Sequence, residues 1–193
     1  EKISESNDGE ELIGNTRYRV LDRRYVAFAE RTGTLRIRGP VFRGQLIDRQ
    51  RRSRFPSFSL PTRGVQAVAP DIELQVAAAD ASTNAAWLPA RRVRLAEELD
   101  LTGPAEQNQA FSRSVQLLID GQLHTQLPSF NWPEPPREQG QTYAEPLQSH
   151  TQAFGDGVRA NLIQRFVHIP QQDRIRLPEI RLPWFNIKTG NWE

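Results

Sequence analysis

Short runs in which apolar and polar residues alternate constrain this chain more than any other feature. They lie at residues 26–28, 35–37, 72–76, 93–95, 115–119, 167–169 and 175–177. A period of two places alternate side chains on the same face of a strand, and Gly or Pro residues punctuate the sequence between the runs. We therefore expect an all-β chain built from half-buried antiparallel strands.

One segment has a helical alternative. Between residues 91 and 101, apolar residues also recur at helical spacing. We prefer a strand that ends at Leu95, followed by a turn that contains Glu97, Glu98 and Asp100. In that interpretation the three acids form no functional carboxylate pair.

A weak internal repeat predicts the domain organisation. Residues 24–30, followed by 35–37, resemble residues 165–171, followed by 175–177, and both predict a strand–turn–strand unit. If the two units are equivalent, residues 87–193 form a second immunoglobulin-like β-sandwich domain and residues 79–86 form a linker. Residues 1–78 would then be the C-terminal part of a first such domain, with exposed strand edges.

The composition is that of a globular chain rather than a disordered one, with 37% hydrophobic residues. No run approaches the ~18 apolar residues that span a bilayer, and no N-terminal signal segment is visible. The chain has no Cys, which removes disulfides, thiolate nucleophiles and Cys-based metal sites. It also has no Met, so we expect a processed or excised fragment.

Basic residues concentrate in residues 13–63, which carry thirteen Arg and three acids. The densest cluster precedes Phe55 and predicts a partner-binding loop: Arg49, Arg51, Arg52 and Arg54. Such a stretch can meet nucleic acid or an anionic membrane surface. Because many of these Arg alternate with apolar residues, we favour the solvated face of a strand and expect no nucleic-acid binding.

No catalytic or metal-binding pattern is found. His124, His150 and His168 lack metal-ligand spacing, and we expect His168 to be a surface or partly buried structural residue of a strand. The sequence has no phosphate-binding glycine loop and no nucleophile elbow. Residues 154–157 contain two Gly around an Asp and predict a tight turn rather than a calcium loop. We expect no enzyme activity and no cofactor.

The aromatic residues divide into packing and contact candidates. We assign Trp87 and Trp184 to core or interdomain packing. Residues 129–146 contain four Pro and one Gly and predict a long loop. Trp132 and Tyr143 lie in that loop, so we predict that they contact a partner.

Several motifs in this order resemble the BatD (Bacteroides aerotolerance) family of bacterial oxygen-tolerance proteins. The resemblance runs from about residue 13 to the end of the chain and rests on residues 18–20 (YRV), 24–28 (RYVAF), 33–37 (GTLRI), 87–90 (WLPA), 177–178 (LP), 183–185 (PWF) and 189–190 (TG). Phe185 stands where a second Trp is expected, and Ala29 where a Pro is usual.

The resemblance implies a periplasmic region of a membrane-anchored protein, with a signal peptide upstream and a transmembrane anchor downstream of this fragment. It implies repeated β-sandwich domains that act as a non-catalytic interaction scaffold. The implied partners are other proteins of the Bat system, namely membrane proteins with von Willebrand A domains and tetratricopeptide-repeat proteins, with an associated MoxR-type ATPase in the cytoplasm. The alternative from the residues themselves is a carbohydrate- or envelope-polymer-binding module that uses Trp132, Tyr143 and nearby Arg.

Overall fold

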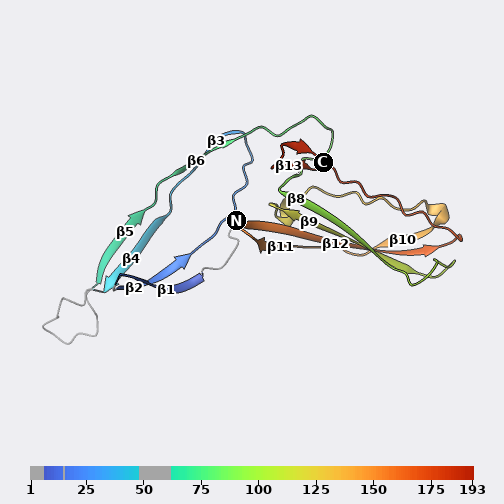
Figure 1. The fold of residues 1–193 in the computed structure, drawn as a ribbon, viewed down its shortest axis with the longest axis horizontal. Helices are drawn as coiled ribbons and strands as arrows, with labels where there is room; N and C mark the ends of the chain where they lie inside the picture. Colours follow the sequence, from blue (N-terminus) through green and yellow to red (C-terminus); the bar gives the residue numbers. More distant parts are fainter. Residues whose placement is uncertain (1–6, 15, 48–61) are drawn as a thin grey trace. The chain divides into compact units, whose positions relative to one another are not determined.

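The computed structural model describes residues 7–14, 16–47 and 62–193 (Figure 1). Strands dominate, and the helices among the described residues are the single turns η1 (His124–Gln126) and η2 (Arg137–Gln139). The all-β prediction is therefore confirmed. The strands are β1 (Asn7–Ile13), β2 (Thr16–Asp22), β3 (Gly33–Ile37), β4 (Val41–Ile47), β5 (Thr62–Val68), β6 (Ile72–Val76), β7 (Pro89–Ala90), β8 (Arg92–Asp100), β9 (Phe111–Asp120), β10 (Gly140–Ala144), β11 (Gln148–Phe154), β12 (Gly157–Pro170), β13 (Phe185–Asn186) and β14 (Asn191–Trp192).

The chain divides into two compact units, one formed by Phe28–Asp80 and the other by Glu1–Ala27 with Ala81–Glu193. The predicted division at residues 79–86 stays a prediction, as does the incompleteness of a first domain. Strands β1 and β2 form an antiparallel hairpin. No helix in the described ranges has the length and apolarity needed to cross a membrane.

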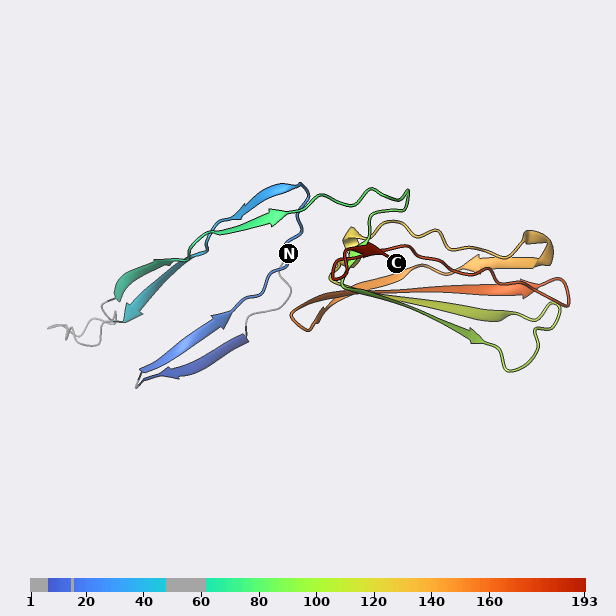
Figure 2. The same cartoon turned by 45° about the horizontal axis from the view of Figure 1, so that its top comes forward.

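The unit Phe28–Asp80 is a two-stranded ribbon. Strand β3 pairs with β6, and β4 pairs with β5, so the two ladders follow one another along the ribbon (Figure 2). Leu35 lies opposite Leu74 and Ile37 opposite Ile72, which places these apolar side chains on one face. Two-stranded sheets need further packing for stability, yet Ile72 remains 55% exposed.

The repeat of strand–turn–strand units is wrong in both places. Residues 26–29 form no strand, and β3 pairs with β6 rather than with them. In the second copy β12 ends at Pro170, and residues 174–184 continue as an irregular extended segment. Sequence similarity between short alternating runs reports strand character but not strand partners, which depend on distant segments.

The unit that contains Ala81–Glu193 has a five-stranded antiparallel sheet at its centre. Strand β9 lies between β8 and β12, while β10 and β11 pair with successive parts of the other edge of β12. Burial alternates along both central strands, so that Val115, Leu117 and Ile119 face the same side as Ala160 and Leu162. These residues form the core.

Irregular segments cover this core. Leu88 and Ala90 are buried on it, and partly buried side chains pack around them: Val93, Leu127, Phe130, Trp132, Leu182 and Trp184. Figure 2 shows the segments at residues 121–139 and 174–184 running over one face of the sheet. Near their end β13 pairs in parallel with β7 and antiparallel with β14, forming a small three-stranded sheet.

Two further predictions about strand limits are corrected. Strand β8 continues past Leu95 to Asp100, because β9 offers a pairing partner along its whole length. Glu97, Glu98 and Asp100 are thus strand residues, not turn residues. The predicted long loop at residues 129–146 contains β10, which pairs with the end of β12. The predicted turn at residues 154–157 is confirmed as the hairpin that joins β11 to β12.

Candidate binding pocket

The predicted contact residues do not form one site. Arg49, Arg51, Arg52 and Arg54 lie outside the described residues. Tyr143 lies opposite Val167, on the sheet face that points away from the core, and is 56% exposed. Trp132 packs against the core cluster on the other face. The two aromatic residues that sequence analysis grouped together are therefore separated by the sheet.

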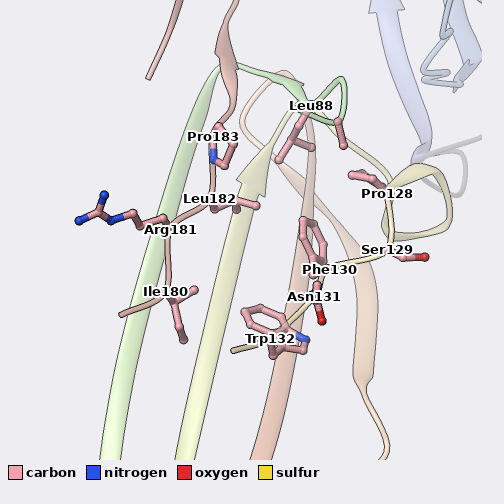
Figure 3. A pocket seen from close by; sticks show the side chains of 11 residues that line it. Leu88, Pro128, Ser129, Phe130, Asn131, Trp132, Ile180, Arg181, Leu182 and Pro183 are labelled. Carbon is pink, nitrogen blue, oxygen red and sulfur yellow. The ribbon is translucent and has the colours of Figure 1, made fainter. Parts of the chain in front are cut away.

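Trp132 instead lines a pocket on the covered side of the sheet. The cavity has a volume of about 130 Å³ and is partly open to solvent. It lies between two extended segments, with Phe130 and Trp132 on one side and Ile180 and Leu182 on the other (Figure 3). Leu88 closes one end, and the Arg181 side chain is directed away from the cavity in Figure 3.

Proline residues explain why both walls are extended without joining a sheet. Proline fixes φ near −65° and lacks the N–H that a ladder requires. The wall at residues 127–136 contains four Pro, and the wall at residues 177–183 begins and ends with Leu177-Pro178 and Pro183. Among the described residues, positions 127–135 and 177–183 make no backbone–backbone hydrogen bond with any other described residue. Both walls therefore present backbone groups that pair with no other described backbone group, although the Pro178 carbonyl accepts from a side chain.

A buried ion pair fixes one wall to the sheet. Arg113 on β9 is only 2% exposed and donates from Nε and Nη2 to the Glu97 carboxylate on β8, at 3.1 and 3.2 Å. Its Nη2 also donates to the carbonyl oxygen of Pro178 at 3.1 Å. Nearby, the backbone N–H of Arg176 donates to the Gln139 side chain. These bonds hold the start of the second wall over the sheet.

His168 lies beside this ion pair in the core. The imidazole is 1% exposed, so the prediction of a surface or partly buried residue is wrong. Its Nδ1 is 2.9 Å from the Thr142 hydroxyl, and Nε2 has no hydrogen-bond partner among the described residues. Burial lowers the pKa of His168, and the positive charge of Arg113 lowers the pKa further. The side chain is therefore a neutral core residue at neutral pH.

A second charged cluster lies on the opposite face, at the other end of the sheet. Asp120 accepts hydrogen bonds from Arg159 and Arg92, and the Arg159 guanidinium carbon lies 3.3 Å from the centre of the Phe154 ring. Burial raises the pKa of Asp120, but the hydrogen bonds and charges of Arg159 and Arg92 outweigh burial and leave that pKa below its usual value. Because Asp120 on β9 is hydrogen-bonded to Arg92 on β8 and Arg159 on β12, the cluster links these three strands and has a structural role.

The remaining aromatic residues pack on one another. Trp87, Phe185 and Trp192 have ring centroids 4.9 to 5.9 Å apart, over the small three-stranded sheet. Rings at such distances are in direct contact, so no ligand fits between them. Trp184 packs against the core cluster, in agreement with the packing role assigned to it.

No group of three or more His, Cys, Asp or Glu side chains in the described ranges is arranged to hold a metal ion. The comparisons with known proteins give no further guide: no family model, no curated protein and no solved structure matches this chain. The site must therefore be interpreted from its own geometry.

Sequence analysis found Trp132 but missed the opposite wall of the pocket. Ile180 and Leu182 alternate with Glu179 and Arg181 between Pro178 and Pro183. That short alternation was a usable signal, since an extended segment between two Pro residues places Ile180 and Leu182 on one side.

Proposed function

We propose that this chain is a non-catalytic protein–protein interaction region and that it contacts its partner through the Trp132 pocket. The observation that carries the proposal is an aromatic-lined, half-open cavity flanked by two extended segments whose backbone groups pair with no other described backbone group. Such cavities accept anchoring side chains, and aromatic residues at their centre contribute most to binding.

The cellular setting belongs to the same proposal. The resemblance of residues 13–193 supports a BatD-like protein whose periplasmic region is anchored to the inner membrane by a segment outside this sequence. Its partners would be von Willebrand A-domain and tetratricopeptide-repeat proteins of the Bat system, in an envelope complex for oxygen tolerance. We further propose that the sheet and its covering segments are variants of a tandem immunoglobulin-like sandwich, in which the parallel β7–β13 pairing contributes to the second layer.

The test uses the full-length protein, isolated from membranes in mild detergent together with its bound proteins. Von Willebrand A-domain and tetratricopeptide-repeat proteins should be recovered with the parent protein. The variant Ala86→Trp should lose them, because Ala86 lines the pocket, is exposed, and can be enlarged without disturbing the sheet. If the parent recovers no such protein, the Bat assignment is wrong. Equal recovery with Ala86→Trp would remove the pocket from the interface.

A carbohydrate- or envelope-polymer-binding module is the second candidate. It keeps one favourable observation, the indole of Trp132 beside the polar side chains of Ser129 and Asn131 at the pocket. It loses Tyr143, which lies on the other face of the sheet. Peptidoglycan sedimentation and a glycan array test it directly, and binding that survives Trp132→Ala would exclude Trp132 as its platform.

A further inference from the structure

The size of the Trp132 pocket limits what can occupy it. Its volume of about 130 Å³ is close to that of an engineered apolar cavity of about 150 Å³ that binds benzene. One aromatic or branched aliphatic group therefore fills it. The apolar lining of Leu88, Phe130, Trp132 and Leu182 favours such a group over a polar one.

The walls add a requirement on the backbone of the ligand. Residues 127–135 and 177–183 are extended, and within the described structure neither makes a backbone–backbone hydrogen bond. The stretches 129–132 and 179–182 contain no Pro and keep their backbone N–H groups, so an extended peptide laid along either stretch can pair with it while one side chain enters the cavity. This is the strand-addition mode of peptide recognition, in which main-chain hydrogen bonds give affinity and a pocket gives specificity.

The charge beside the second wall selects the flanking residues of such a peptide. Within the second wall, residues 177–183, Arg181 is paired with Glu179, so the positive charge of this segment lies just before the wall, at Arg174 and Arg176. Arg174 and Arg176 are exposed, whereas Ile175 and Leu177, which alternate with them, are partly buried. Arg181 lines the cavity, but its side chain is paired with Glu179 and directed away from the cavity (Figure 3). A partner with carboxylates on the Arg176 side of its apolar anchor complements this arrangement.

We propose that the Trp132 pocket binds an extended segment of a partner protein in which one bulky apolar side chain has acidic residues on its Arg176 side. The proposal rests on the proposed interaction function and specifies the chemistry of the partner. Arg176 and Ile180 are four residues apart, and an extended chain advances roughly 3.3 Å per residue. Partner residues near Arg176 would therefore be about 13 Å from partner residues near Ile180. The acidic positions are therefore expected within about four residues of the anchor on the side facing Arg176.

The experiment selects peptides from a phage-displayed random dodecapeptide library on the immobilised full chain, with Ala86→Trp as the counter-selection. Enriched peptides should share one Leu, Ile, Phe or Trp with Asp or Glu on one side of it. Synthetic copies should bind the parent chain with an affinity that falls as salt is added. Trp132→Ala should raise the dissociation constant of these peptides about 30-fold, as loss of an aromatic anchor does.

Two pairs of matched variants separate the pocket from the general surface. Arg176→Glu should weaken binding about tenfold, while Arg165→Glu, on the opposite face of the sheet, should not change it. Trp132→Ala is matched by Tyr143→Ala, an exposed aromatic residue that also lies on that opposite face. Since Trp132 packs on the core, the unfolding midpoint of each variant is measured first, and Ala86→Trp provides a test that leaves the core intact.

Three results would overturn the proposal: no enrichment on the parent over Ala86→Trp, enriched peptides without acidic residues, or equal affinity for Arg176→Glu. Failure here is distinguishable from failure of the proposed function. If membrane isolation recovers partners that Ala86→Trp loses, but no acidic peptide is selected, the pocket binds a part of the partner other than an extended acidic segment. If no partner is recovered and acidic peptides still bind, the peptide chemistry is correct and the Bat setting is wrong.

Discussion

In the ion pair between Arg113 and Glu97, loss of the more exposed Glu97 should lower the free energy of unfolding more than loss of the buried Arg113. The Arg113 side chain is 2% exposed and that of Glu97 is 40% exposed. Removing one partner of a buried pair costs about 3–5 kcal/mol when the remaining charge is left uncompensated. In Glu97→Ala, Arg113 keeps the carbonyl of Pro178, and water can enter where Glu97 was. We therefore expect a loss of about 2–3 kcal/mol in the free energy of unfolding.

Replacing the arginine should cost less. Arg113→Met removes the buried charge and keeps an unbranched, flexible side chain at the site, while the Glu97 carboxylate regains water at its exposed site. Replacing both members of a buried pair by apolar residues is often neutral or stabilising, and here the 40% exposed Glu97 can remain because water can solvate its carboxylate. Only the carbonyl oxygen of Pro178 is left without its donor, at a cost of about 1 kcal/mol. The double variant Glu97→Ala/Arg113→Met should match Arg113→Met alone.

Urea unfolding followed by tryptophan fluorescence measures these differences. All four Trp residues lie within residues 87–193, so the signal reports the unit that contains the ion pair. Far-UV circular dichroism of the same samples checks that each variant retains its β structure. If Arg113→Met loses over about 1 kcal/mol more than Glu97→Ala, the pair contributes net stability and the desolvation argument is refuted.

Three further predictions concern the sheet. In the unfolded chain His168 binds a proton near pH 6.5, whereas burial lowers the pKa of His168 in the folded chain, so the contribution of His168 to stability should be constant above pH 6.5 and fall as the pH decreases toward the folded pKa. Urea midpoints measured from pH 8 to pH 5 should fall less in His168→Gln than in the parent, and an equal fall would contradict this origin. Leu117→Ala, at a fully buried position, should lose about 2–5 kcal/mol by urea unfolding, while Leu118→Ala on the opposite face should lose less; equal losses would show that both faces are covered. A Cβ at Gly140 would lie 2.5 Å from the carbonyl oxygen of Ile169, so Gly140→Ala should lower the thermal midpoint more than Gly155→Ala, whose Cβ would meet nothing within 4 Å; the reverse order would refute the steric argument.

The alternation of apolar residues was sufficient to predict the central strand of the core. Val115, Leu117 and Ile119 were expected on one face, and they are fully buried there. The pattern was misleading on β12, where Val167 and Ile169 suggested the inward face. The structure instead buries Phe166 and His168, because β12 is apolar on both faces at this end and a shift of one residue reverses the face.

Strand partners and the binding pocket could not be predicted from local patterns. The pairing of Leu35 with Leu74 joins residues far apart in the chain, and no local periodicity encodes such a contact. Arg113 is a second case, because the period of two places it on the same face as Val115, but no local pattern shows what compensates its charge there. It is buried because Glu97 on the neighbouring strand and the carbonyl of Pro178 compensate its charge, and all three meet only after folding.

The pairing of β12 has a consequence for synthesis on the ribosome. Strands β8 and β9 are consecutive and can form a hairpin as soon as both have emerged, but β10 and β11 find their ladder partner only in β12, the last strand of the sheet to be made. Until β12 has left the exit tunnel, the edge of β9 that pairs with β12 has no partner strand. Assembly of the core therefore waits for β12, and until then the unpaired edge of β9 is open to intermolecular strand pairing.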